Sequence, residues 1–343
     1  MENLAFAAFN NSTKERLMSS SGGMFILLAR QILSWGGVVY GVSMSPKCDF
    51  AEYVRAQDFG AIFPLLRSKY MQARVGSTFK RVQEDLENRL PVLFTGTGCQ
   101  INGLKCYLNK NYDNLYAVDV VCHGVPSPML WRKYIGWIEN KYQSEIKSVN
   151  FRCKDSGWAD FGIKKITDRR KQIFTSQKMD PYMQMFLKNY CLRPSCYECA
   201  AKKYKLADMS IADFWGIEDV VPEMNDNKGI SMVIVRTEQG KKLFRAIEKD
   251  ISYLTIEYKD AIKKNPAEFS SVVRPEQRND FFEDMIAMNF GDLSQKYVPI
   301  PFKRKVKNII LKTPLKNLIG GGINQKSNVD YGLLFTFADK EKC

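Results

Sequence analysis

Short apolar runs and stretches of helical periodicity alternate along the first 145 residues of the chain. The apolar runs have the length and composition of buried strands, and the stretches between them repeat their apolar residues at helical spacing. Strands are predicted at 38–44, 91–97 and 116–122, and helices at 24–33, 76–89, 98–109 and 127–142. Because strands alternate with helices, we expect an α/β fold with a mainly parallel central sheet flanked by helices.

The pattern changes after residue 145. Three short strands with turn signals at 155–157 and 168–169 predict an inserted antiparallel meander at about 146–177. Beyond it we expect a helix at 180–190, a loop that carries cysteines, strands near 209–213 and 230–235, and a helix at 239–249. The sequence therefore predicts an α/β domain over residues 1–258 and a helical C-terminal region with a basic tail over residues 259–343.

Composition narrows the class of protein. With 21 Phe, 16 Tyr and 5 Trp the chain is too rich in aromatic residues to be disordered. The longest apolar run, at 24–35, contains Arg30 and Gln31 and is too short to span a bilayer, and the first residues do not have the pattern of a signal peptide. We expect a cytoplasmic location, where thiols stay reduced unless something binds them.

The formal net charge is +14, and much of it lies near the end of the chain. Residues 301–328 hold seven Lys or Arg and no acid. The remainder is modestly basic and has no DNA- or RNA-binding motif, so no nucleic-acid partner is expected. The basic tail mixes its charges with apolar residues, which is typical of a solvated surface helix; docking to an acidic ferredoxin or peripheral contact with anionic lipid is the alternative.

Four of the nine cysteines stand apart by their neighbours. Cys99 follows the first of two neighbouring predicted strands, Cys122 ends the second, and Cys196 and Cys199 form a Cys-x-x-Cys pair. Because open α/β sheets gather ligands at the carboxyl ends of their parallel strands, we expect Cys99 and Cys122 to meet there, with the pair closing over them. Four thiolates complete a 4Fe–4S site.

Spacing alone leaves three other interpretations open. In the first, Cys99 and Cys122 are small buried apolar residues. In the second, zinc is held by Cys122, His123, Cys196 and Cys199. In the third, the pair is redox-active, although a thioredoxin-type motif opens a helix directly after a strand and this pair does not.

Other residues near these cysteines invite weaker interpretations. Cys191 is the substitute should one of the four fail, and Cys106 is expected in the core. A strand followed by Gly96, Thr97 and Gly98 mimics a dinucleotide fingerprint, but Ile101 stands where the third glycine is required, which argues against NAD binding.

A second candidate site precedes the first predicted helix. The turn formed by Ser21, Gly22 and Gly23 would offer backbone N–H groups to an anion such as a flavin phosphate, and the segment at 67–70, with Lys69, would add charge and stacking. An ordinary capped helix explains the serines equally well.

Seven stretches of the sequence together resemble a known family. They are SSSGGMF (19–25), GGVVYG (36–41), RSKY (67–70), VLFTGTGCQINGL (92–104), VDVVCHGVPSP (118–128), LRPSCYEC (192–199) and ADMSIADFWGI (207–217). In this order they are similar to the coenzyme F-420 hydrogenase/dehydrogenase beta-subunit family, and they cover roughly residues 5–260.

The resemblance implies an iron–sulfur flavoprotein whose relatives relay electrons between clusters, FAD and coenzyme F-420 or another acceptor. The implied cluster ligands are Cys99, Cys122, Cys196 and Cys199. The implied flavin-binding residues are Ser21, Gly22, Gly23, Lys69 and Thr97.

The chain also departs from the family. It resembles the form without the N-terminal ferredoxin module that many relatives carry, so we expect a separate ferredoxin-like electron donor. Gly98 stands where the family usually has Pro. Relatives of this shape occur in bacterial cell-surface polysaccharide gene clusters, which need not supply coenzyme F-420, so a small-molecule or sugar-linked acceptor is expected. The alternative hypothesis is a non-enzymatic partner protein in a polysaccharide-assembly complex, with a purely structural metal.

Overall fold

The computed structural model describes residues 3–299 of the chain. The predicted basic tail at 301–328 lies outside the described residues. The strands are β1 (Leu4–Asn10), β2 (Val38–Met44), β3 (Ala51–Ala56), β4 (Ala73–Arg74), β5 (Val92–Thr97), β6 (Leu115–Val120), β7 (Ile146–Cys153), β8 (Gly162–Thr167), β9 (Gln172–Ser176), β10 (Met209–Asp213), β11 (Ser231–Val235) and β12 (Ile251–Ile256). The α-helices are α1 (Thr13–Met18), α2 (Met24–Ser34), α3 (Thr78–Glu87), α4 (Gly98–Leu108), α5 (Pro128–Tyr142), α6 (Pro181–Leu187), α7 (Ile217–Val220), α8 (Glu238–Ile247), α9 (Tyr258–Ile262), α10 (Arg278–Ala287) and α11 (Phe290–Tyr297).

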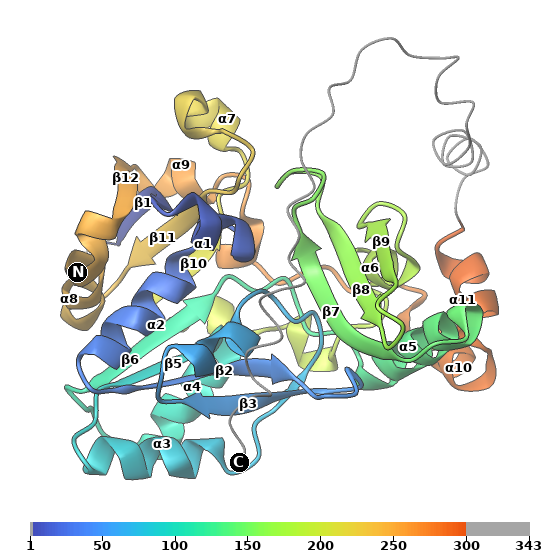
Figure 1. Cartoon of the computed structure of the whole chain (residues 1–343), viewed down its shortest axis with the longest axis horizontal. Coiled ribbons are helices and arrows are strands. Elements are labelled where there is room, and N and C mark those ends of the chain that lie inside the picture. The colour runs from blue at the N-terminus through green and yellow to red at the C-terminus, as the bar shows by residue number, and fades with distance from the viewer. Residues whose placement is uncertain (1–2, 300–343) are drawn as a thin grey trace. The chain divides into compact units, whose positions relative to one another are not determined.

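The larger of two sheets has its parallel strands in the middle (Figure 1). Its strand order is β12-β1-β11-β10-β6-β5-β2-β3-β4 within the described residues. β10, β6, β5 and β2 pair in parallel, whereas β11, β1 and β12 on one flank, and β3 on the other, join by antiparallel pairing. The mainly parallel centre and the α/β class agree with the sequence prediction.

Both faces of the central strands are covered, and the sequence of each strand explains why. Side chains alternate between the two faces of a strand. In β2, Val38 and Tyr40 belong to the apolar core on the side of α3 and α4, whereas Val39 belongs to the core on the side of α2 and α8. In β5, Phe94 and Leu93 divide in the same way. Strands buried on both faces read as continuous apolar runs, which made them visible in the sequence.

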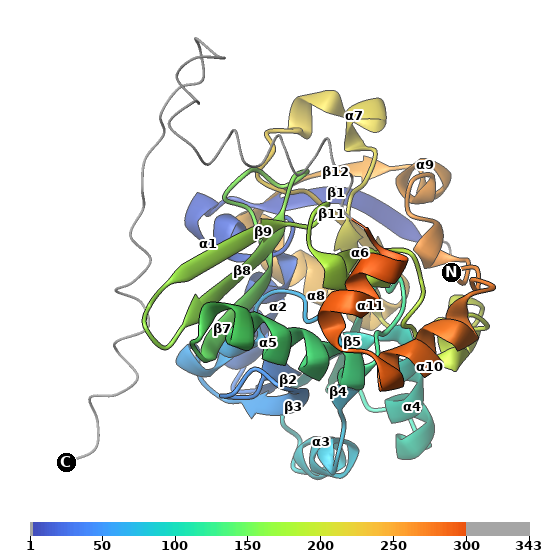
Figure 2. The same cartoon turned by 90° about the vertical axis from the view of Figure 1, so that its right-hand side faces the viewer.

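The predicted meander is present as a separate antiparallel sheet of β7, β8 and β9. It lies beside the large sheet rather than extending it (Figure 1). Helices α5, α6, α10 and α11 pack together next to this small sheet (Figure 2). The helices expected after residue 258 are thus present as far as the described residues reach, and the part of the chain up to Val298 forms one compact unit. Because the structure describes the chain only to residue 299, the division at 258/259 stays a prediction.

Besides the two-residue strand β4, the sequence missed three strands, β1, β3 and β12. All three join the large sheet through antiparallel pairs outside its parallel centre. β1 is rich in alanine, a residue depleted in strands, and it is buried mainly because it pairs with β11 and β12 on either side. Pairing with β11 and β12 therefore makes this segment a strand, although its own composition gave no clear signal for one.

A buried polar group joins the small sheet to its helices. Lys165 of β8 is fully buried and donates to Tyr134 of α5 (2.6 Å) and to Asp180 at the start of α6 (3.2 Å). Tyr134 also donates to Asp180 (2.5 Å), and burial, followed by the negative charge of Asp180, raises the pKa of the tyrosine. A buried ion pair of this kind becomes costly when one partner is removed.

Replacing Asp180 by Ala should destabilise the protein by about 3–5 kcal/mol, because it leaves the Lys165 ammonium buried without its anion. The matched control is Asp160→Ala, which breaks an ion pair with Lys178 (2.6 Å) in which both side chains are more than half exposed. That change should move the free energy of unfolding by less than about 1 kcal/mol. Urea unfolding measures both variants, and equal losses would contradict the prediction.

Candidate functional site

Cys99 and Cys122 lie together because β5 and β6 are parallel neighbours. Thr97, the last residue of β5, is in register with Val120, the last residue of β6. Cys99 follows β5 in the first turn of α4, and Cys122 follows β6 by two residues. Both cysteines therefore leave the sheet at the same carboxyl edge, as the sequence predicted.

Backbone pairing brings the Cys-x-x-Cys loop to the same edge. The backbone of Arg193 donates to Val125 (2.9 Å), that of Ser127 donates to Cys191 (2.9 Å), and an antiparallel bridge joins Pro126 to Leu192. The loop with Cys196 and Cys199 thus starts beside the segment that follows Cys122. The pair opens no α-helix: Cys196 ends the 3₁₀ turn η2 (Pro194–Cys196), and Cys199 precedes the 3₁₀ turn η3 (Ala200–Lys202).

One pocket is lined by all four predicted cysteines. Its wall consists of Thr97, Gly98, Cys99, Asp119, Val120, Val121, Cys122, His123, Gly124, Val125, Cys196, Cys199, Ala201, Lys202 and Lys205. Four thiols are the donor set of a 4Fe–4S cluster and of tetrahedral zinc alike, so the chemistry of the pocket fits either group. Among residues 3–299, however, no three Cys, His, Asp or Glu side chains are already arranged to hold a metal ion. The thiols surround the pocket without converging on one point, and their role as ligands stays a prediction.

Burial and mutual repulsion hold the buried thiols in their protonated form. Burial raises the pKa of Cys122 to about 12, the ammonium of Lys202 opposes this rise, and the neighbouring Cys99, Cys196 and Cys199 add to it. Burial likewise raises the pKa of Cys196. A bound cation would reverse this balance, because thiolates are stabilised by the metal that they bind.

The start of α4 fixes the position of Cys99. The backbone N–H of Thr97 donates to the side chain of Gln100 (2.9 Å) as part of a capping box, and the Thr97 hydroxyl lies 3.2 Å from the Cys99 sulfur. A Cβ on Gly98 would lie only 3.0 Å from Asp119 and 3.2 Å from the Cβ of Ala201. Glycine, in place of the proline common in the family, therefore lets α4 begin close against its neighbours.

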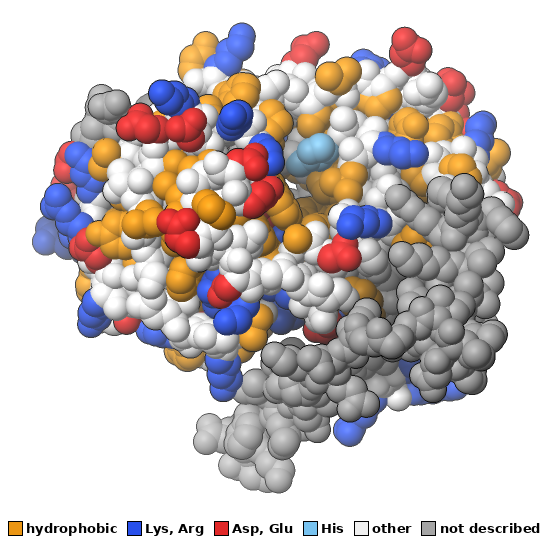
Figure 3. Space-filling view, turned by 90° about the horizontal axis from the view of Figure 1, so that it is seen from above, with side chains coloured by type: hydrophobic (Ala, Val, Ile, Leu, Met, Phe, Trp, Pro, Cys, Tyr) orange, Lys and Arg blue, Asp and Glu red, His pale blue; other side chains and the backbone are white. Residues whose placement is uncertain are grey.

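His123 lines the pocket but already has hydrogen-bond partners. Its Nε2 lies 2.7 Å from the Asn189 side-chain oxygen, and its ring packs edge-on against Phe186 at 5.1 Å. Burial lowers the pKa of His123, and the hydrogen bonds with Asn189 and the Phe186 backbone oppose that shift. A zinc site that uses this histidine would have to break one of these contacts. In Figure 3 the histidine lies at the surface with hydrophobic side chains next to it.

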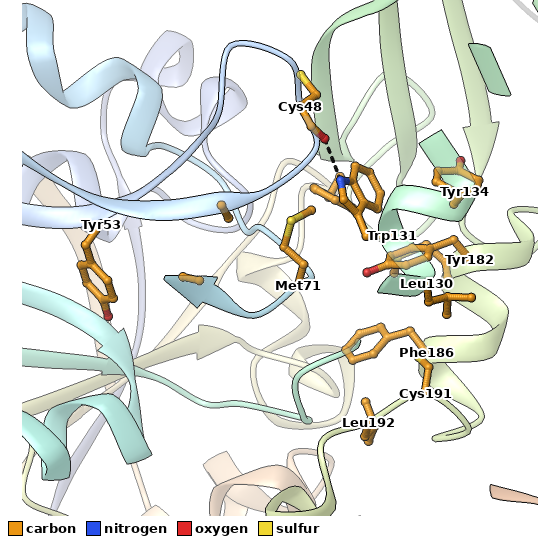
Figure 4. Close-up of a cluster of buried hydrophobic side chains, with 14 of the residues drawn as sticks. Cys48, Tyr53, Met71, Leu130, Trp131, Tyr134, Tyr182, Phe186, Cys191 and Leu192 are labelled. Carbon is orange, nitrogen blue, oxygen red and sulfur yellow. Dashed lines mark hydrogen bonds between the residues drawn. The ribbon is translucent and has the colours of Figure 1, made fainter. Parts of the chain in front are cut away.

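The other described cysteines do not line the pocket. Cys191, the expected substitute, is fully buried beside Phe186 and Leu192 in the apolar core (Figure 4), and burial raises its pKa to about 12. The backbone oxygen of Cys48 accepts a hydrogen bond from Trp131 (2.7 Å) in the same core. The expectation that Cys106 belongs to the core was wrong: its side chain is exposed, because it falls on the outer face of α4.

The predicted flavin-binding residues fall into two places. Thr97 lies with the cysteines, whereas Ser21, Gly22 and Gly23 form the turn before α2. That turn packs on the sheet: the N–H of Gly22 donates to the hydroxyl of Ser231, the first residue of β11 (3.0 Å). β11 is two strands from β6 in the sheet, so the two strands lie roughly 10 Å apart, and the turn and the cysteine pocket share one edge of the sheet.

Lys69 belongs to a segment, residues 67–70, that is hydrogen-bonded next to this turn. The neighbouring Ser68 donates its backbone N–H to Ser20 (2.9 Å), which ties the segment at 67–70 to the turn. The Lys69 ammonium donates to the backbone oxygens of Pro64 (2.9 Å) and Leu66 (2.7 Å), and burial lowers its pKa to about 7. The structure thus brings Lys69 and the turn together, apart from Thr97.

Sequence reasoning missed two basic residues at the same place. Lys154, which follows β7, donates to the backbone oxygens of Arg16, Ser21 and Lys228, and burial lowers its pKa to about 7. Arg152 of β7 is buried and donates to Asp213 (2.7 Å) at the end of β10. The sequence signal for these residues was the placement of basic side chains at alternate positions of the meander. Only the fold shows that these side chains face the turn before α2.

Aromatic rings connect the two places. Tyr70, from the segment that carries Lys69, contacts Phe186 at 5.2 Å between ring centres, and Phe186 contacts His123 at 5.1 Å. His123 in turn lines the cysteine pocket. A continuous row of packed rings therefore runs from the segment at 67–70 to the thiols.

The protein is thus an α/β protein with four cysteines around one pocket at the carboxyl edge of its sheet. Residues 91–261 match the family model for the C-terminal part of the beta subunit of coenzyme F420 hydrogenase/dehydrogenase, and the chain belongs to this beta-subunit family. Comparison with curated proteins found no significant match.

Among solved structures, a chain of the F420-reducing NiFe hydrogenase complex from Methanosarcina barkeri, from a xenon-derivatised crystal, shares the fold. The similarity has a TM-score of 0.51 and 16% identity, and it covers 86% of this chain and 90% of that one. At this identity the match supports the fold alone. In the described residues, no helix is both long and apolar enough to cross a membrane.

In the metal-free protein, the cysteines should differ strongly in reactivity. With a pKa of about 12, only about one Cys122 thiol in ten thousand is ionised at pH 8, so alkylation of Cys122 and Cys191 should be slow and should speed up about tenfold for each pH unit. The exposed Cys99 and Cys106 should react before both of them. Iodoacetamide labelling followed by peptide mass spectrometry measures the order, and equal rates for Cys122 and Cys106 would refute the assignment.

Gly22 is required by close packing, independently of any ligand. A Cβ on Gly22 would lie 2.5 Å from the backbone oxygen of Ala8 and 2.7 Å from the backbone nitrogen of Ser231. Gly22→Ala should therefore lower the free energy of unfolding by about 1–3 kcal/mol. Gly136 lies exposed in α5 with open space around it, so Gly136→Ala should stabilise by about 0.5–1 kcal/mol. Urea unfolding compares the two, and a neutral Gly22→Ala would contradict the packing argument.

Proposed function

We propose that this chain is an electron-relay component of an oxidoreductase, holding a 4Fe–4S cluster on Cys99, Cys122, Cys196 and Cys199 and FAD near the turn before α2. One observation carries the proposal: cysteines from three separated segments line a single pocket at the carboxyl edge of the sheet. Membership of a hydrogenase/dehydrogenase subunit family supports the redox class.

Each part of the protein has a task in this proposal. The cluster and the flavin, when bound, supply one-electron transfer and two-electron chemistry respectively. The chain's own residues hold the thiols in place, and the capping box at Thr97 fixes the entry of α4 behind Cys99. The rings of His123, Phe186 and Tyr70 fill the space toward the flavin-binding turn with packed side chains and so keep water out of it.

The flavin phosphates would be bound by the turn at Ser21, Gly22 and Gly23 together with Lys69. Lys154 and Arg152 support this assignment, because both are basic and both lie against the same turn. Within residues 3–299, the acceptors of the Lys69 and Lys154 ammonium groups are backbone oxygens, and a phosphate would be a stronger, charged acceptor.

The donor and acceptor are proposed from the family resemblance. We propose a ferredoxin-like donor and a small-molecule or sugar-linked acceptor in cell-surface polysaccharide synthesis. That the similar solved chain is part of a hydrogenase complex supports a partner protein. Coenzyme F-420 is the less favoured acceptor.

The second candidate is a non-enzymatic partner protein that binds a structural metal and no flavin. A specific observation favours it: Lys69 and Lys154 already have hydrogen-bond acceptors in the protein itself, so the turn can be stable without a ligand. Zinc or a cluster would then serve stability alone.

Anaerobic reconstitution with iron and sulfide tests the proposal. The wild-type protein should take up four irons per chain and turn brown, with broad absorbance in the visible range. Cys196→Ser and Cys199→Ser should each lose most of this absorbance, while Cys106→Ser, at the exposed cysteine outside the pocket, should keep it. A wild-type protein without iron would refute the proposal.

Flavin content separates the two candidate functions. The supernatant of heat-denatured protein, purified with added FAD, should be yellow if the relay proposal holds. Lys154→Met should lower the bound flavin about tenfold or more, because it removes a charge beside the turn. Metal bound without any flavin would favour the structural alternative.

A further inference from the structure

Lys202 is a basic residue whose position in the pocket is unusual. It ends η3, three residues after Cys199, and its side chain is half-buried in the pocket wall. Its ammonium donates to the backbone oxygen of Cys122 (2.5 Å) and to that of Ala267. Among residues 3–299, no carboxylate forms an ion pair with Lys202.

A carboxylate close to Lys202 is already bound to two other cations. Glu268 is buried; one of its oxygens accepts from Lys205 (3.2 Å), and the other accepts from Arg236 (2.5 Å). Lys205 lines the same pocket as Lys202 but shares this single carboxylate with Arg236. Asp119 also lines the pocket, but no ion pair within residues 3–299 joins it to Lys202. Lys202 is therefore a cation of the pocket wall that has no carboxylate partner among the described residues.

An ammonium in a half-buried site without an anion costs free energy. Lys202 follows Cys199 by three residues and donates to the backbone oxygen of Cys122, so two of the four cysteines are its neighbours. Two backbone oxygens hold the ammonium beside these thiols. The ammonium of Lys202 thus favours binding of a negatively charged group by the thiols of the pocket.

We propose that Lys202 is the counter-charge of the metal–thiolate group and favours its more reduced state. A bound cluster would gain one unit of negative charge on one-electron reduction, and the fixed ammonium of Lys202 would stabilise that charge without any proton having to move. Lys202 acts through the electrostatic field and not as a ligand. This inference rests on the proposed function and adds a residue that sets the reduction potential.

Three variants of the reconstituted protein test the role of the charge. Lys202→Gln keeps a hydrogen-bond donor and removes the charge, Lys202→Arg keeps the charge, and Lys203→Gln removes an exposed neighbouring charge as the matched control. An anaerobic redox titration with dithionite, followed by visible and EPR spectra, measures the midpoint potential. At the wild-type midpoint potential, the ratio of reduced to oxidised protein should be at least about tenfold lower in Lys202→Gln than in the wild type. The midpoint potentials of Lys202→Arg and Lys203→Gln should stay near that of the wild type.

Each outcome decides the question. An unchanged potential in Lys202→Gln, or an equal shift in Lys203→Gln, overturns the role of Lys202 while leaving the cluster intact. If Lys202→Gln folds, as judged by circular dichroism, but takes up no iron, then iron uptake by Lys202→Arg supports the counter-charge; loss of iron in both overturns it. A wild-type protein that takes up no iron is a different result, because it refutes the proposed function itself.

Discussion

The parallel pairing of β5 with β6 is the constraint on which the candidate site depends. Parallel strands present their carboxyl ends at one edge, so the residues that follow Thr97 and Val120 leave the sheet side by side. Each strand supplies one cysteine, and the loop of the Cys-x-x-Cys pair is fastened to the segment after β6 by backbone hydrogen bonds. Main-chain geometry therefore brings the four cysteines to one pocket.

Charge at this edge follows a consistent pattern. The ammonium groups of Lys69, Lys154 and Lys202 are satisfied by backbone oxygens and, within the described residues, by no carboxylate ion pair. Burying positive charge in this way is unfavourable unless a negative group balances it. By contrast, the buried Lys165 is paired with Asp180. The carboxyl edge of the sheet thus has an electrostatic preference for anionic groups at both the cysteine pocket and the turn before α2.

The small sheet and the helices packed next to it contribute side chains to the carboxyl edge of the large sheet. Arg152 and Lys154 reach the turn before α2 from β7 and the residue after it, while α6 supplies Phe186, which packs between Tyr70 and His123. An insertion that the sequence marks only as a change of periodicity therefore contributes side chains to both places. The α/β core positions the thiols, and the inserted layer fills the space between them and the turn.

The sequence by itself determined the parallel core, the meander and the common edge of Cys99 and Cys122, because buried parallel strands are continuous apolar runs and cysteines after such strands share an edge. It did not determine β1 or β12, whose burial comes from antiparallel partners far along the chain. It also did not reveal Lys154, or the place of Lys202 beside the cysteines without a carboxylate partner. Those depend on which backbone oxygens and carboxylates the fold brings within hydrogen-bond distance, and only the tertiary structure decides such distances between residues far apart in sequence.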